Sequence, residues 1–163
     1  MRSSDPAVTE LRAGLGFDVH ASDPSRALRL GGVSFDGEAG LAGHSDGDVV
    51  CHAVADALLG ASALGDIGEH FPDTDPTIRG IGGLELLARA VTLVADADLS
   101  PASCDVTVIG ERPAIAPRRD EMRTMLAQAL HLPPGLVSVK ATRPEGLGLS
   151  GDGVGCLALV TLR

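Results

Sequence analysis

Apolar residues recur at three- and four-residue spacing in two segments of the chain. Residues 48–64 carry the longer set, which comprises Val49, Val50, Ala53, Val54, Ala57, Leu58 and Ala61. Residues 84–95 repeat this spacing with Leu84, Leu87, Ala88 and Val91. Such spacing places apolar side chains on one stripe of a helix. A third helix is predicted from Pro117 to about residue 130, because proline suits a first helical turn and Pro133 and Pro134 prevent continuation.

Five shorter segments have the apolar and β-branched content of strands, at residues 12–20, 27–35, 104–109, 136–142 and 154–162. Glycines punctuate the first two, and we expect these two to pair with each other. Residues 39–48 and 66–76 are polar, glycine-rich loops on either side of the first helix. Strands and helices alternate without a linker or repeat, which predicts an α+β fold.

Length and composition narrow the possibilities further. A chain of 163 residues suits one domain, which we place at residues 11–163 after a flexible tail at residues 1–10. A net charge of −9, without a basic stripe, argues against nucleic acid as a partner. No apolar run approaches the roughly 18 residues of a membrane span, so no membrane partner is expected. The three cysteines lack a C-x-x-C spacing, which favours a reducing, cytoplasmic location.

Asp18, His20 and His52 form a candidate metal site. Residues two apart on a strand project to the same face, so the carboxylate and imidazole of Asp18 and His20 can converge. His52 would join them from the opening turns of the first helix. Two imidazoles and a carboxylate suit Zn²⁺, and three protein ligands leave a fourth position for water or substrate. Alone, an Asp-x-His sequence is equally typical of an ordinary turn.

Two loops flank the predicted helix with dense polar side chains. Residues 43–48 are Gly-His-Ser-Asp-Gly-Asp, and residues 65–76 contain Asp66, His70 and Asp73 among glycines. Glycines let backbone N–H groups approach a ligand closely, which suits phosphate oxygens and hydroxyl groups. A solvated loop would explain either segment by itself.

Taken together, these segments resemble the 2-C-methyl-D-erythritol 2,4-cyclodiphosphate synthase family. The resemblance follows one order along the chain and covers nearly all of it after the tail. The segments that carry it are Gly-Phe-Asp-Val-His at 16–20, Ala-Gly-His-Ser-Asp-Gly-Asp-Val at 42–49, Asp-Ala-Leu-Leu-Gly-Ala at 56–61, Ala-Leu-Gly-Asp-Ile-Gly at 63–68, Phe-Pro-Asp-Thr-Asp-Pro at 71–76, Asp-Val-Thr-Val-Ile at 105–109 and Val-Lys-Ala-Thr at 139–142.

The resemblance implies a fold, an assembly and a reaction. The fold would be ferredoxin-like, with a mixed four-stranded sheet, helices on one face and a small β-hairpin. The subunits would form a homotrimer with active sites at their interfaces. Zn²⁺ would be held by Asp18, His20 and His52, and a second divalent cation, Mg²⁺ or Mn²⁺, by Glu145. The 2-phosphate of a CDP-methylerythritol 2-phosphate would attack the β-phosphorus and release CMP, a step of the non-mevalonate isoprenoid pathway.

The resemblance also assigns individual residues. Catalytic roles would belong to His44, Ser45, Asp66, Thr142 and Glu145. The methylerythritol and phosphate groups would contact His44, Ser45, Asp66, Gly68, Phe71 and Asp73. The cytidine side would be formed by Gly110, Pro113, Ala114, Ile115, Ala116, Ala141, Thr142 and Arg143.

The chain departs from the family pattern near the nucleotide. Ala114 replaces a lysine, Arg143 and Pro144 replace two threonines, and Asp152 replaces an arginine that lines a central cavity of the family's trimer. Arg143 could restore the lost charge or mark another substrate. Two alternatives therefore stay open: an enzyme of the same fold acting on a different nucleotide-activated phosphate, and an inactive trimer that binds metal.

Overall fold

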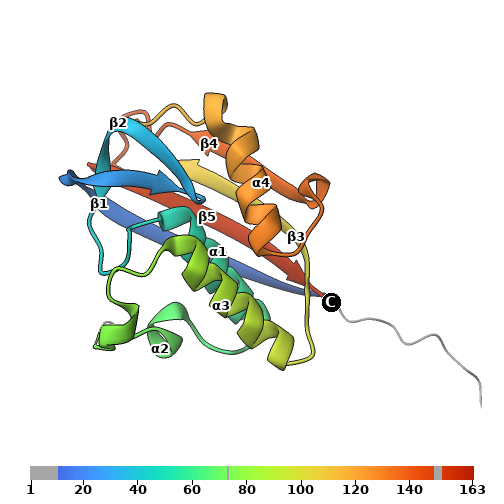
Figure 1. Cartoon of the computed structure of the whole chain (residues 1–163). Helices are drawn as coiled ribbons and strands as arrows, with labels where there is room; N and C mark the ends of the chain where they lie inside the picture. The colour runs from blue at the N-terminus through green and yellow to red at the C-terminus, as the bar shows by residue number, and fades with distance from the viewer. Residues whose placement is uncertain (1–10, 73, 149–151) are drawn as a thin grey trace, which may run out of the picture.

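The computed structural model describes residues 11–72, 74–148 and 152–163, through which one mixed sheet runs (Figure 1). The predicted N-terminal tail and Asp73 lie outside the described residues. The strands are β1 (Arg12–Leu30), β2 (Val33–Leu41), β3 (Pro101–Ile109), β4 (Val137–Thr142) and β5 (Gly153–Leu162). Their order across the sheet is β2-β1-β5-β3-β4, with β3 and β4 parallel and the other neighbours antiparallel.

The prediction that residues 12–20 pair with residues 27–35 is wrong. The first half of β1 pairs with β5 instead, in a register from Arg12↔Leu162 to Ala21↔Gly153. The chain first reverses at Gly31 and Gly32, whose φ angles of 58° and 78° suit glycine. Residues 27–30 therefore belong to the end of β1 and pair with β2. Because β1 is 19 residues long, it joins the hairpin to the rest of the sheet, which has five strands rather than four.

The helices are α1 (Val49–Ala61), α2 (Ile67–His70), α3 (Gly83–Asp96) and α4 (Arg119–Ala129), with 3-10 turns at Pro76–Ile78, Ala116–Arg118 and Pro134–Leu136. Two predicted loops are shorter than expected, because β2 extends to Leu41 and α2 interrupts residues 66–76. The helices α1, α3 and α4 lie on one side of the sheet (Figure 1). None of the described helices is long and apolar enough to cross a membrane.

The two faces of the sheet differ in burial. Toward the helices, strands β3 and β5 contribute fully buried side chains such as Val106, Ala158 and Val160. On the opposite face, Leu15 is 66% exposed and Phe17 is 51% exposed. Apolar side chains of β1 and β5 therefore remain uncovered on this face in a single chain.

Two glycines of β1 allow α1 to lie directly against the strand. A methyl group on Gly14 would lie 2.0 Å from the carbonyl oxygen of Ala57, and one on Gly16 would lie 1.9 Å from that of Ala53. Both distances are far below van der Waals contact. The absence of a side chain at these positions therefore sets the distance between α1 and β1.

We expect Gly16→Ala to destabilise the fold by about 1–3 kcal/mol or more, because the strand and helix backbones would have to separate. Gly60→Ala is the matched control, since a methyl group there meets nothing within 4 Å. The control should be neutral or up to about 1 kcal/mol more stable, because alanine favours a helix over glycine. Urea denaturation measures both, and a Gly16→Ala midpoint equal to that of the parent would contradict the packing argument.

Candidate metal centre

Asp48 anchors the helix that carries one of the candidate ligands. Its side chain is fully buried and accepts hydrogen bonds from the N–H groups of Val50 and Cys51, each at 3.1 Å. These bonds cap the N-terminus of α1. The same carboxylate accepts the N–H groups of Gly31 and Gly32 in the hairpin turn, at 2.8 and 2.7 Å. The start of α1 is therefore tied to both its own first turn and the hairpin.

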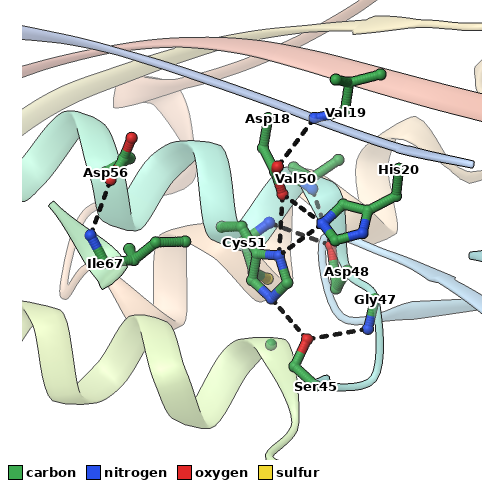
Figure 2. A network of polar contacts seen from close by, with 12 residues as sticks. Asp18, Val19, His20, Ser45, Gly47, Asp48, Val50, Cys51, Asp56 and Ile67 are labelled. Carbon is green, nitrogen blue, oxygen red and sulfur yellow. Dashed lines mark hydrogen bonds and ion pairs between the residues drawn. The ribbon is translucent and has the colours of Figure 1, made fainter. Parts of the chain in front are cut away.

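The side chains of Asp18 and His20 lie close together near Ser45 and Asp48 (Figure 2). His52 of α1 joins them, and one potential ligand atom from each of the three residues lies within 4.8 Å of the others. The Oδ2 atom of Asp18 lies 2.8 Å from Nε2 of His20 and 3.0 Å from Nδ1 of His52. These two nitrogen atoms are 3.4 Å apart. The three predicted ligands thus lie within reach of a single ion.

The protein holds the second ring nitrogen of each histidine. Nδ1 of His20 is hydrogen-bonded to the carbonyl oxygen of Ala42. A carbonyl only accepts, so Nδ1 carries a proton, and Nε2, which faces Asp18, is the nitrogen on the side of the candidate ion. Nε2 of His52 lies 2.8 Å from Oγ of Ser45, which leaves Nδ1 on the side of Asp18. Metal-binding histidines are commonly oriented by such contacts.

The donor set fits a tetrahedral ion. Bonds of zinc to nitrogen and oxygen place two ligand atoms about 3.3 Å apart. The donor atoms here are separated by 2.8, 3.0 and 3.4 Å, so a small outward shift of the side chains would admit the ion. Three ligands leave a fourth coordination position for a substrate oxygen or water.

Asp18 supplies the negative charge of this group. Burial by itself would raise the pKa of Asp18, but hydrogen bonds with His20 and His52 outweigh it and hold that pKa far below its ordinary value. The hydrogen bond with Asp18 raises the pKa of His20, while partial burial and the positive charge of Arg26 act in the opposite direction. Asp18 is therefore an anion at neutral pH.

The two sides of α1 have different roles. Cys51 is fully buried, and burial raises the pKa of its thiol well above the ordinary value. It therefore stays a neutral core residue and is not part of the ligand group of Asp18, His20 and His52. Asp56 lies one turn beyond His52, and its carboxylate accepts the N–H of Ile67 at 3.0 Å (Figure 2). This bond holds the start of α2 beside the metal centre.

A cavity of about 260 Å³ opens beside the three ligands. Its polar wall includes Asp18, His20, His44, Ser45, His52 and Arg79, and its apolar wall includes Ile67, Phe71, Ile78, Ile81 and Leu86. The loop before α1 and the segment before α3 are joined by a hydrogen bond from the N–H of Gly80 to the carbonyl of His44, at 2.9 Å. The three candidate ligands, the guanidinium of Arg79 and an apolar wall thus surround one space.

Five residues assigned to the methylerythritol and phosphate side lie around this centre, namely His44, Ser45, Asp66, Gly68 and Phe71. Asp66 also caps α2 by accepting the N–H of Glu69 at 2.9 Å. The sixth, Asp73, lies outside the described residues.

The residues assigned to the cytidine side begin at the carboxyl ends of β3 and β4. Strands β3 and β4 are parallel, so their carboxyl ends meet, and the N–H of Gly110 donates to the carbonyl of Thr142 at 3.2 Å. Gly110 and Thr142 therefore adjoin, whereas Arg112 pairs with Glu38 of β2 at 2.9 Å. Across the sheet, two strand spacings of about 4.8 Å separate β3 from β1 and three separate β4 from β1, and none of the assigned cytidine-side residues lines the cavity beside the three ligands. One chain does not bring them to the three ligands.

Arg79 is a site residue without a clear signal in the sequence. It is exposed, and of the lysine and arginine residues in the described part of the chain, it alone lines the cavity. Its position in a loop after the polar segment 71–76 resembles that of any surface arginine. Only the folding of this loop against residues 43–48 places its charge beside the metal centre.

Fold and site together define an α+β protein with a candidate metal site that faces a cavity. The YgbB family profile matches residues 11–163. The chain therefore belongs to the YgbB family.

Comparison with individual relatives agrees with this assignment. The chain is 51% identical to the 2-C-methyl-D-erythritol 2,4-cyclodiphosphate synthase of Salinibacter ruber, over 94% of this chain and 99% of that protein. It is 52% identical to the bifunctional enzyme IspD/IspF of Anaeromyxobacter sp. over 89% of this chain, and spans only 37% of that longer relative. A solved 2C-methyl-D-erythritol-2,4-cyclodiphosphate synthase in a CDP-bound form is 36% identical, with a TM-score of 0.87 over 93% of this chain and all of that one.

We expect His52→Ala to lose the divalent metal ion while His131→Ala keeps it. His52 supplies one of three donor atoms, whereas His131 follows α4 and is exposed. Both variants and the parent should be incubated with Zn²⁺, dialysed and analysed for bound metal. The parent and the His131→Ala control should retain about one ion per chain, and equal metal content in all three proteins would remove His52 from the site.

Proposed function

We propose that this chain converts 4-CDP-2-C-methyl-D-erythritol 2-phosphate to 2-C-methyl-D-erythritol 2,4-cyclodiphosphate and CMP, as a cyclising lyase of non-mevalonate isoprenoid biosynthesis. The observation that carries this proposal is the group of Asp18, His20 and His52, with its open side toward the cavity. The names of the full-length relatives support the same reaction.

The reaction is an intramolecular phosphoryl transfer. An oxygen of the 2-phosphate forms a bond to the β-phosphorus, and the bond from that phosphorus to the bridging oxygen breaks. CMP leaves with the bonding electron pair, so the step needs no oxidant and no protein nucleophile. Such transfers depend on positioning and on neutralisation of phosphate charge.

The residues around the cavity can supply both positioning of the substrate and neutralisation of phosphate charge. Asp18, His20 and His52 would hold Zn²⁺, which supplies Lewis acidity to a phosphate oxygen when it is bound. Arg79 places a guanidinium on the cavity wall and would contact a phosphate oxygen. His44 lies on the same wall, while Asp66 and Gly68 would bind the hydroxyl groups of the methylerythritol.

The nucleotide would lie against residues 110–116 and 141–143, with a second divalent cation, Mg²⁺ or Mn²⁺, held by Glu145 and the diphosphate. CDP-bound relatives of the same fold support a nucleotide substrate. Arg143 is exposed at the end of β4 and could take the place of the lysine that Ala114 replaces.

We further propose that three chains associate through the uncovered face of the sheet, each with a ferredoxin-like arrangement of β1, β5, β3 and β4. The exposed apolar side chains on this face include Leu15, Phe17, Val19, Leu157 and Leu159. A neighbouring subunit that covers them can bring its nucleotide side against the metal centre. Three copies related by a closed rotation would complete three equivalent sites.

The reaction is tested by ³¹P NMR of the parent protein with Zn²⁺, the CDP substrate and either Mg²⁺ or Mn²⁺. We expect the diphosphate signals to be replaced by those of a cyclic diphosphate and CMP. No conversion with either second cation would contradict the proposed reaction. Conversion of a different CDP-activated phosphate in its place would favour the alternative substrate.

The assembly is tested with Leu159→Arg, which places a charge on the uncovered face. We expect native mass spectrometry to show a trimer for the parent and a monomer for this variant, because an unpaired charge in an apolar interface is costly. Leu136→Arg changes a similarly exposed leucine outside the sheet, and this control should remain trimeric. A monomeric parent would exclude the trimer.

A further inference from the structure

The side chain of Arg26 forms two hydrogen bonds with the loop that precedes α1. Arg26 lies late in β1, and its side chain reaches across to residues 43–45. Nη1 donates to the carbonyl oxygen of Gly43 at 2.5 Å, and Nη2 donates to the carbonyl oxygen of Ser45. The two acceptors stand on either side of His44. A planar guanidinium is suited to hold two such acceptors in a fixed relation.

Ser45 connects Arg26 to the candidate metal centre, because it contacts both Arg26 and His52. Its side chain is only 8% exposed. Its Oγ atom accepts the N–H of Gly47 at 3.1 Å and lies 2.8 Å from Nε2 of His52 (Figure 2). The backbone of Ser45 is therefore held by Arg26 while its hydroxyl group faces the ring of a metal ligand.

We propose that Arg26 and Ser45 are positioning residues for the metal centre, which act by orienting the ring of His52. With Nε2–H directed at Ser45, Nδ1 of His52 presents its lone pair toward Asp18 and the ion. Without that acceptor, the Nδ1–H form can instead donate to Asp18, and the ligand atom is then blocked by its own proton. This role differs from the substrate contact that the family resemblance assigns to Ser45.

The position of Arg26 makes this inference sharply testable. Arg26 is a cation near a site for another cation, so Coulomb repulsion alone would weaken metal binding. If charge were its main effect, removal of Arg26 would strengthen Zn²⁺ binding. The positioning role requires the opposite result.

The inference rests on the zinc site of the proposed function. Its test measures the affinity for Zn²⁺ and does not depend on catalytic turnover. Zn²⁺ affinity is determined by competition with a chelating dye for the parent and for Arg26→Gln, Arg26→Lys and Ser45→Ala. We expect both Arg26→Gln and Ser45→Ala to bind Zn²⁺ about 10- to 100-fold more weakly, as expected when the partner of a metal-binding histidine is lost. Arg26→Lys should resemble Arg26→Gln, because an ammonium group cannot reproduce the two-pronged contact.

Arg29→Gln is the matched control. It removes one positive charge from the same strand, three residues away, where the side chain is exposed. This control should bind Zn²⁺ as the parent does. Urea denaturation of the metal-free proteins should give similar midpoints for the parent, Arg26→Gln and Arg29→Gln. Similar midpoints would show that weaker Zn²⁺ binding by Arg26→Gln does not arise from a loss of folding stability.

A double variant tests whether the two residues act in series. If Arg26 acts through Ser45, Arg26→Gln combined with Ser45→Ala should lose no more affinity than Ser45→Ala alone, and fully additive losses would overturn the inference. Unchanged or stronger Zn²⁺ binding by Arg26→Gln would also overturn it. A parent that binds no Zn²⁺ would overturn the metal site itself, and this inference with it.

Discussion

The close approach of α1 to β1 is the constraint on which the metal centre depends. Gly14 and Gly16 leave no side chain between the strand and the carbonyl oxygens of Ala53 and Ala57. Ligands from the strand and from the helix can meet only because these two backbones are in contact. A larger separation would move His52 away from Asp18, and the three donor atoms could not share one ion.

The helix also spaces the polar groups along the site. Asp48, His52 and Asp56 follow one another at four-residue intervals, which places them on the same side of α1. Asp48 holds the hairpin turn, His52 contacts Asp18 in the candidate metal site, and Asp56 holds the start of α2. One helical turn separates Asp48 from His52, and another separates His52 from Asp56. The hairpin turn and the start of α2 are therefore both positioned relative to His52.

The residues proposed to bind the metal ion and those proposed to bind the nucleotide lie in two regions of the sheet. The metal ligands come from β1 and α1, whereas the residues assigned to cytidine follow β3 and β4. The uncovered apolar face lies between these regions on β1 and β5. Assembly and catalysis would therefore be coupled, because the contact that buries this face would also join the two parts of the active site.

Local patterns in the sequence predicted the main helices and the three residues of the candidate metal site. They did so because helical periodicity, capping and the chemistry of side chains depend on residues close together in the chain. The tertiary structure decided that β1 pairs with β5, that Arg26 reaches residues 43–45, and that Arg79 lines the cavity. These contacts join segments that are far apart in sequence, and their partners are selected by the packing of the whole sheet against α1 rather than by any local pattern.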